Sequence, residues 1–161
     1  MSKEILISKR DGRKEPLELD KLHKVVFHAC EGITGVSESE VEIKSHIQFY
    51  TGITSSEIQE TLIKSAADLI TEETPNYQFV AGRLINYHLR KQVYGTFTPP
   101  CLCDIIQGNI DRGFYDPEIL ELYTKIEIDE LSNYIAHERD ESLTYAAMEQ
   151  FRGKYLVQNR N

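Results

Sequence analysis

The stretch ISKRDGRKEPLELDKLHK, residues 7–24, decides how the N-terminal part of this chain folds. The residues leading into it alternate in polarity and favour β structure, so we expect a strand over residues 4–9. Asp11-Gly12 is a strong hairpin signal, because glycine accepts a positive φ, and a return strand should follow over residues 13–17. Pro16 has no N–H to donate, so the return strand should lie at the edge of its sheet.

Four successive segments then follow in which apolar residues recur with the 3.6-residue period of a helix. Asp20 is a suitable N-cap for a first helix that begins at Lys21 and ends at Gly32. A second helix should follow Ser37 and end at Gly52, with acidic residues in its first turn as the helix dipole favours.

The third and fourth helices have clearer end signals. Thr54 with Glu57 three residues later forms a capping box for the third. Pro75 occupies a tolerated first-turn position of the fourth, which should close at Gly95. Residues 1–95 are therefore predicted to form a mainly α (α+β) domain, a hairpin followed by four helices.

The sequence TFTPPC, residues 96–101, interrupts this pattern and is the best domain boundary. Beyond it we expect four shorter helices: Leu102–Arg112, Pro117–Tyr123, Ile128–His137 and Leu143–Gln150. Their apolar faces are interrupted and acidic. We therefore expect the all-helical segment 96–161 to pack on the first domain or on a partner rather than to bury a core of its own.

The composition is that of a globular protein in a reducing compartment. The 161 residues are 40% hydrophobic and 27% charged. No apolar run approaches the roughly 18 residues that span a bilayer, and the first residues lack a secretory pattern. The cysteines, Cys30, Cys101 and Cys103, follow no disulfide spacing. We expect a cytoplasmic protein with no membrane partner.

The net charge of -8 is unevenly distributed. Residues 1–24 carry seven Lys/Arg against five Asp/Glu, and residues 83–95 carry three Lys/Arg and no acid. The acidic balance argues against broad binding to a nucleic-acid backbone. Two basic islands suit a small anion if folding brings them together, and solvated surface charge is the alternative.

Familiar catalytic and metal motifs are absent. The glycines form no G-x-G-x-x-G, and C-x-C without a second pair is not a zinc motif. No Ser/His/Asp or Cys/His arrangement stands out. We predict no catalytic residue and no metal ligand from protein side chains.

One set of polar residues remains as a candidate binding site. Its basic residues lie beside the hairpin turn, at the start of the first helix and on one face of the fourth helix. Its two neutral polar residues lie in the first turns of the third helix. The basic residues are Lys9, Arg10, Lys21, His88 and Lys91, and the neutral ones are Ser55 and Gln59. If the hairpin lies across the helix ends, they could bind a polyphosphate, with each charge-assisted bond worth about 1.5–3 kcal/mol. Glu15 could accept a bond from the exocyclic amine of a base. Taken one at a time, each residue is more simply explained as a surface charge.

The same stretches carry a family resemblance. KRDG (9–12), SHIQFY (45–50), SAADLI (65–70), HLRK (88–91) and GKYLVQNR (153–160) resemble the N-terminal part of the large (α) subunit of class I ribonucleotide reductase, of the enteric-bacterial and phage type. The resemblance covers essentially the whole chain. It implies that residues 1–95 form an ATP-cone, a four-helix bundle capped by a small β-sheet that binds ATP or dATP with Mg²⁺. Residues 96–161 then form a helical lead-in to a catalytic barrel.

The resemblance assigns roles to ten positions. Lys9, Arg10, Lys21, His88 and Lys91 match residues around the phosphates and sugar, Glu15 matches an adenine contact, and Ile7 matches an apolar residue beside the nucleoside. Three positions depart from the family pattern. Ser55 stands where Thr is usual and keeps the hydroxyl, Gln59 replaces His, and Glu18 replaces Asn and so offers only an acceptor.

The function implied is an allosteric switch of overall reductase activity. ATP would activate, and dATP would inhibit by making the cones grip the radical-generating β subunit. The cysteines of this chain do not align with the family's catalytic cysteines, so the chain alone should not reduce ribonucleotides. Two alternatives remain: one chain of a split reductase that needs a separately encoded barrel, and a nucleotide-responsive transcriptional regulator. The acidic charge and the lack of a paired C-x-x-C disfavour the regulator.

Overall fold

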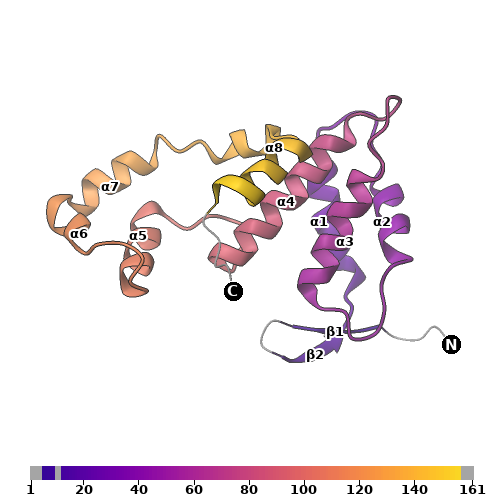
Figure 1. Cartoon of the computed structure of the whole chain (residues 1–161), viewed down its shortest axis with the longest axis horizontal. Coiled ribbons are helices and arrows are strands. Elements are labelled where there is room, and N and C mark those ends of the chain that lie inside the picture. Colours follow the sequence, from indigo (N-terminus) through magenta and orange to yellow (C-terminus); the bar gives the residue numbers. More distant parts are fainter. Residues whose placement is uncertain (1–4, 10–11, 157–161) are drawn as a thin grey trace. The chain divides into compact units, whose positions relative to one another are not determined.

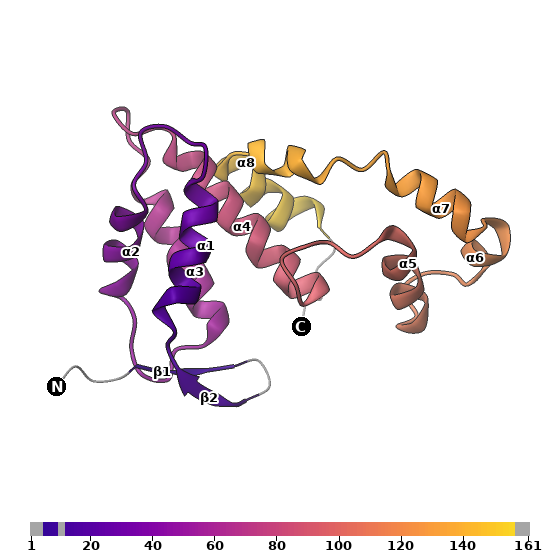
Figure 2. The same ribbon diagram turned by 180° about the vertical axis from the view of Figure 1, so that it is seen from behind.

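The computed structural model describes residues 5–9 and 12–156. The chain divides into two compact units, one built from residues 1–89 together with residues 140–161, the other from residues 90–139. Figure 1 and Figure 2 show the ribbon from two opposite sides. Each unit is described by itself.

A short antiparallel hairpin opens the first unit. Strand β1 (Leu6–Ser8) pairs with β2 (Lys14–Pro16), with Ile7 opposite Glu15. Gly12 has a φ of 82° in the turn, as the Asp-Gly signal predicted. Both strands lie within the predicted ranges and are shorter than predicted.

The strand β1 lies between two neighbours. On the side away from β2, Ser8 forms a parallel bridge with Thr54, and its backbone N–H donates to the Ile53 carbonyl over 2.9 Å. The Gly52 N–H donates to the Leu6 carbonyl over 2.7 Å. β2 is left at the edge, so the placement of Pro16 on an edge strand is confirmed.

Four helices form the bundle of this unit: α1 (Leu19–Cys30), α2 (Glu38–His46), α3 (Ser55–Ala67) and α4 (Tyr77–Tyr94), the last of which runs on into the second unit. α1 follows β2 directly and leads away from the hairpin, α2 brings the chain back, and α3 begins beside β1. α2 stands at the outer side of the bundle (Figure 1) and packs against both α1 and α3. In both views the hairpin lies across the ends of α1 and α3 (Figure 1, Figure 2). The four-helix bundle capped by a small sheet is confirmed.

The buried stripes of these helices meet in one core. Val26, Val41, Leu62 and Leu84, one from each helix, are fully buried. The Tyr77 hydroxyl donates to the Glu40 carboxylate and accepts from the Ser37 N–H over 2.9 Å, and so joins α4 to the start of α2. Burial, with this contact, raises the pKa of Tyr77 to about 12.

Two of the predicted helix boundaries are wrong. Glu18, and not Asp20, is the N-cap of α1, because the extended chain leaving β2 turns into the helix two residues earlier; Asp20 stands in the first turn. α2 ends at His46 and not at Gly52. The N–H groups of Gln48 and Phe49 bond carbonyls three residues back, and this tight turn leads the chain to β1.

Two other helix ends are confirmed. Thr54 and Glu57 form the expected capping box: the Thr54 N–H donates to Glu57 Oε2 over 2.8 Å, and the Glu57 N–H donates to Thr54 Oγ1 over 3.2 Å. Gly95 ends α4 with a φ of 75°. The prediction that Pro75 lies in the first turn of α4 is wrong: the helix begins two residues later, at Tyr77, and Pro75 belongs to the turn before it, where its carbonyl accepts from the Gln78 N–H.

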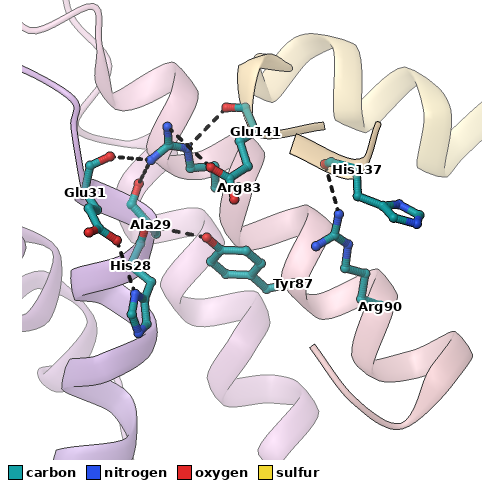
Figure 3. A network of polar contacts seen from close by, with 8 residues as sticks. All are labelled: His28, Ala29, Glu31, Arg83, Tyr87, Arg90, His137 and Glu141. Atoms are coloured by element: carbon teal, nitrogen blue, oxygen red, sulfur yellow. Dashed lines mark hydrogen bonds and ion pairs between the residues drawn. The ribbon is translucent and has the colours of Figure 1, made fainter. Parts of the chain in front are cut away.

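Arg83 of α4 ties the end of α1 to a distant part of the chain (Figure 3). Its Nη1 donates to the carbonyls of Ala29, 3.3 Å, and Glu31, 2.7 Å, and its Nε donates to the Glu141 carbonyl, 3.2 Å. The last carbonyls of a helix have no partner within the helix, so a guanidinium there satisfies them and suits the helix dipole.

The C-terminal part of the first unit packs on α4. It comprises the end of the 3₁₀ helix η1 (His137–Ser142), α8 (Tyr145–Gln150) and the π-helical turn η2 (Phe151–Tyr155). Met148 of α8 is 4% exposed and belongs to the core. A Cβ on Gly82 would lie 2.2 Å from the Leu143 carbonyl oxygen, so glycine at this position is what allows the close approach.

The second unit contains α5 (Leu102–Asp111), α6 (Glu118–Leu122) and α7 (Lys125–Ser132). The predicted helix Ile128–His137 is displaced, because a capping box of Thr124 and Glu127 starts α7 earlier. Ile128 is the one buried side chain among residues 90–139. This unit therefore buries little core of its own. No helix in the described ranges is long and apolar enough to cross a membrane.

We predict that Gly82→Ala destabilises the first unit by about 1–3 kcal/mol, because the added methyl group would overlap the Leu143 carbonyl. Urea unfolding monitored by circular dichroism measures the change. Gly153→Ala is the matched control, since a Cβ at Gly153 meets no atom within 4 Å. Equal midpoints for Gly82→Ala and the wild type would contradict the close approach.

Candidate functional site

The hairpin turns one face toward the helices. Ile7 is 6% exposed and belongs to the core, and residues two apart on a strand point to the same side. Glu15 stands opposite Ile7, and Lys9 follows two residues later, so both share its face. Lys14 points to the other side and is exposed. Three predicted site residues therefore lie on the inner face of the hairpin.

Lys9 and Glu15 form an ion pair on that face. Lys9 Nζ lies 2.8 Å from Glu15 Oε1, and each side chain is about one-third exposed, 31% and 33%. The hydrogen bond from Lys9 lowers the pKa of the Glu15 carboxyl, and the positive charges of Lys9, Lys21 and Arg13 act in the same direction. The Lys21 charge therefore lies close enough to act on the hairpin.

The start of α1 adds a second pair. Glu18 caps the helix through its backbone, with no side-chain cap bond, and its Oε1 lies 2.9 Å from Lys21 Nζ. A hydrogen bond from Lys21 to Glu18 raises the pKa of Lys21. Both side chains are more than half exposed, so this pair contributes little to stability.

The first turn of α3 lies beside the hairpin because Thr54, its N-cap, bridges to Ser8. Ser55 is the first residue of the helix, and Gln59 follows one turn later. Helix N-termini attract anions, but the Glu57 carboxylate already occupies the capping box at this end. An additional anion here would need the neighbouring cations to offset that charge.

Gln59 carries a buried acceptor. Its Oε1 is inaccessible to solvent and has no hydrogen-bond partner among the described residues. A buried acceptor without a partner costs about 1–3 kcal/mol. A ligand hydroxyl or amine that donated to it would recover that free energy.

His88 of α4 is 1% exposed, and its Nε2 lies 3.3 Å from Glu60 Oε1. The same Glu60 oxygen lies 2.6 Å from Arg152 Nη1, in the π-helical turn. Neither Glu60 nor Arg152 was predicted from the sequence. The Glu60–Arg152 contact spans 92 residues, so no local pattern could have indicated it.

Two of the predicted site residues are not placed beside the others in the first unit. Lys91 lies one turn beyond His88 on α4, in the unit 90–139, where its Nζ lies 5.1 Å from the centre of the Phe97 ring. Arg10 lies outside the described residues. The structure groups Ile7, Lys9 and Glu15 on the hairpin, beside the start of α3 with Ser55. The other predicted residues lie on or beside helices of the same unit: Glu18 and Lys21 at the start of α1, Gln59 on α3 and His88 on α4.

A separate cavity of about 300 Å³ lies elsewhere in the first unit, at the Arg83 network of Figure 3. Gly32, Ile33, Thr34, Asn76, Phe79, Arg83, Glu141 and Ser142 line it. The guanidinium of Arg83 is committed to carbonyl oxygens there. None of the ten predicted site residues lines this cavity.

Comparison with known proteins gives one family and several relatives. Residues 5–92 match the ATP cone domain. The chain is 50% identical over 160 residues to ribonucleoside-diphosphate reductase 1 subunit alpha of Escherichia coli and 49% identical to the subunit alpha of Haemophilus influenzae. An Enterobacteria phage subunit alpha is 39% identical over 158 residues. These alignments cover 97–99% of this chain and 21% of each relative, so the chain spans about a fifth of their length.

We predict that Lys9→Met raises the pKa of Glu15, because it removes the hydrogen bond that lowers that pKa most. Titration of the Glu15 carboxyl ¹³C signal measures the shift. In the wild type, the stabilisation from the pair is present at neutral pH and lost as the pH falls through the lowered pKa of Glu15.

Lys14→Met is the control, since Lys14 lies on the opposite face of the hairpin. It should leave the Glu15 titration nearly unchanged. An unaltered pKa in Lys9→Met would mean that the two side chains do not pair in solution.

Proposed function

This chain belongs to the ATP-cone family, and we propose that it is a nucleotide-binding regulatory module that responds oppositely to ATP and dATP. The match over residues 5–92 carries the proposal, because it includes all ten positions predicted to line the site. The hairpin cation Lys9, on the strand that bridges to the N-cap of α3, supports it independently, since a positive charge near a helix N-terminus suits phosphate.

In this proposal the triphosphate competes with carboxylates for the cations. Lys9 and Lys21 are held by Glu15 and Glu18 in exposed or half-exposed ion pairs, a class worth about 0.2–1 kcal/mol. A charge-assisted bond to a phosphate oxygen is worth about 1.5–3 kcal/mol. The exchange therefore favours the ligand, with Arg10, His88 and Lys91 as further phosphate or sugar contacts.

The nucleoside would lie against the inner face of the hairpin. Ile7, which is 6% exposed, would touch the nucleoside only through the small part of its side chain that the core leaves uncovered, and Glu15, released from Lys9, could accept a hydrogen bond from the adenine amine. Ser55 and Gln59 offer a hydroxyl and a buried acceptor to the ligand. ATP and dATP differ by one 2′-hydroxyl, so discrimination requires a coupling of about 1–3 kcal/mol, which one hydrogen bond can supply.

Magnesium would enter with the triphosphate. The described residues contain no group of three His, Cys, Asp or Glu side chains placed to hold a metal ion. Mg²⁺ commonly binds nucleotide phosphates while keeping several waters. The phosphate oxygens are therefore the proposed ligands.

The proposed setting is a ribonucleoside-diphosphate reductase. The relatives named above are alpha subunits of that enzyme. We propose the catalytic barrel, on the same or a separate alpha chain, and the radical-generating β subunit as partners. ATP would favour the active assembly, and dATP would favour an assembly in which the cones hold the β subunit unproductively.

We predict that Lys91→Ala abolishes binding of ATP and dATP, measured by isothermal titration calorimetry with Mg²⁺ present. The lost cation is proposed to contact the phosphates together with His88. Lys64→Ala is the control, because Lys64 is exposed on α3 and lies outside the predicted site. If Lys91→Ala binds ATP as tightly as the wild type, the site assignment is wrong. If the wild type binds neither nucleotide, the proposed regulatory function is wrong.

We also predict that Glu18→Asn tightens ATP binding severalfold in the same titration. The substitution removes a negative charge 2.9 Å from Lys21 and restores the amide usual in the family at this position. Asp20→Asn is the control, since it removes a nearby charge from the same helix turn without touching this pair. Equal affinities for Glu18→Asn and the wild type would show that Glu18 does not compete with the ligand.

A further inference from the structure

Glu60 joins three elements of the first unit through one carboxylate oxygen. On α3, Glu60 Oε1 lies 3.3 Å from Nε2 of His88 on α4 and 2.6 Å from Nη1 of Arg152 in η2. Arg152 Nη2 also lies 2.7 Å from Glu149 Oε1 on α8. The buried imidazole is thus linked to the C-terminal segment through a single shared anion.

His88 is buried, whereas Glu60 and Arg152 are partly exposed to solvent. His88 is 1% exposed, while the side chains of Glu60 and Arg152 are 46% and 26% exposed. The imidazole cannot move without repacking the core, whereas Glu60 and Arg152 can rearrange at the surface. If a ligand binds to His88, Glu60 is therefore the side chain that moves.

Glu60 also imposes an electrostatic cost on any anion that reaches His88. Two negative charges within a few ångströms repel, and Arg152 offsets the Glu60 charge by pairing with the same carboxylate oxygen that lies near His88. Without Arg152, a phosphate approaching His88 would face an uncompensated carboxylate. The contact between Glu60 and Arg152 thus lowers the electrostatic repulsion that an anion meets at His88.

We propose that Glu60 and Arg152 are positioning residues that couple occupancy of the nucleotide site to docking of the segment Tyr145–Tyr155. The inference rests on the proposed function, because it treats His88 as part of that site. A phosphate that accepts a hydrogen bond from the imidazole displaces Glu60 from His88, and Glu60 Oε1 then contacts Arg152 without sharing that oxygen with His88. Coupling of this kind is reciprocal, so docking of the segment strengthens nucleotide binding by the same factor.

The segment is suited to this coupling by the way it is held. Its N-terminal side is fixed by Met148 in the core and by the close approach of Leu143 to Gly82. Its C-terminal side reaches α3 through Arg152, within a single π-helical turn, a geometry often found at functional sites. One end is therefore anchored in the core, and the other contacts α3 through a surface ion pair.

The test compares the wild type and three variants by two measurements, ATP affinity from calorimetry and hydrogen–deuterium exchange of peptides within residues 145–155. In the wild type, ATP should slow exchange in this segment. Arg152→Met should bind ATP about fivefold more weakly and lose the ATP-dependent protection, while Arg152→Lys keeps part of both. Lys154→Met, an exposed cation in the same turn, should match the wild type.

A double-mutant cycle isolates the electrostatic part. Glu60→Gln removes the charge that Arg152 offsets, so Arg152→Met should have little further effect on ATP affinity in a Glu60→Gln background. A purely structural role for Arg152 would instead weaken binding equally in both backgrounds. If Arg152→Met fails to fold, Arg152→Lys and Glu60→Gln give the same comparison.

Failure of the coupling and failure of the function give different results. If the wild type binds neither ATP nor dATP, the proposed function fails and the coupling fails with it. If the wild type binds ATP while Arg152→Met binds equally tightly and keeps the ATP-dependent protection, the coupling alone is wrong.

Discussion

The bridge between Ser8 and Thr54 is the constraint on which the proposed site depends. Thr54 pairs with β1 through its backbone and caps α3 through its side chain, so one residue fixes the hairpin to the first turn of the helix. The inner face of the hairpin carries Lys9 and Glu15, and the helix contributes Ser55. Residues some 45 positions apart are thereby held at one end of the bundle.

Charge compensation is the second theme of the molecule. Lys9, Lys21 and His88 each contact a carboxylate, from Glu15, Glu18 and Glu60 respectively. For the two lysines, an acidic chain can in this way present a cation to a ligand while pairing it with a carboxylate in the absence of the ligand. In our proposal the ligand replaces these weak contacts with stronger ones, and the released Glu60 carboxylate couples the nucleotide site to the segment Tyr145–Tyr155.

The sequence predicted what depends on neighbouring residues. The positive φ of Gly12, the Thr54–Glu57 capping box and the glycine end of α4 at Gly95 each depend on one or two residues, and all are confirmed. The end of α2 and the start of α7 were misplaced, because a tight turn at Gln48 and a second capping box at Thr124 outweighed the apolar period. The assignment of nucleotide contacts, and the division of function at residue 95, stay predictions.

What could not be predicted is long-range pairing. Arg152 meets Glu60 across 92 residues, and Gly82 admits Leu143 only because two distant backbones approach closely. Neither contact leaves a periodic or local trace in the sequence. Both determine how the C-terminal segment packs against the helix bundle within the first unit.

The most direct test maps backbone amide shifts of the ¹⁵N-labelled chain during titration with ATP and Mg²⁺. Our account predicts that the largest shifts fall on Ser8 and Lys9 and on the first turn of α3 from Ser55, where the hairpin meets the helix. Shifts confined to the residues around the Arg83 cavity, with the hairpin and α3 unchanged, would contradict it.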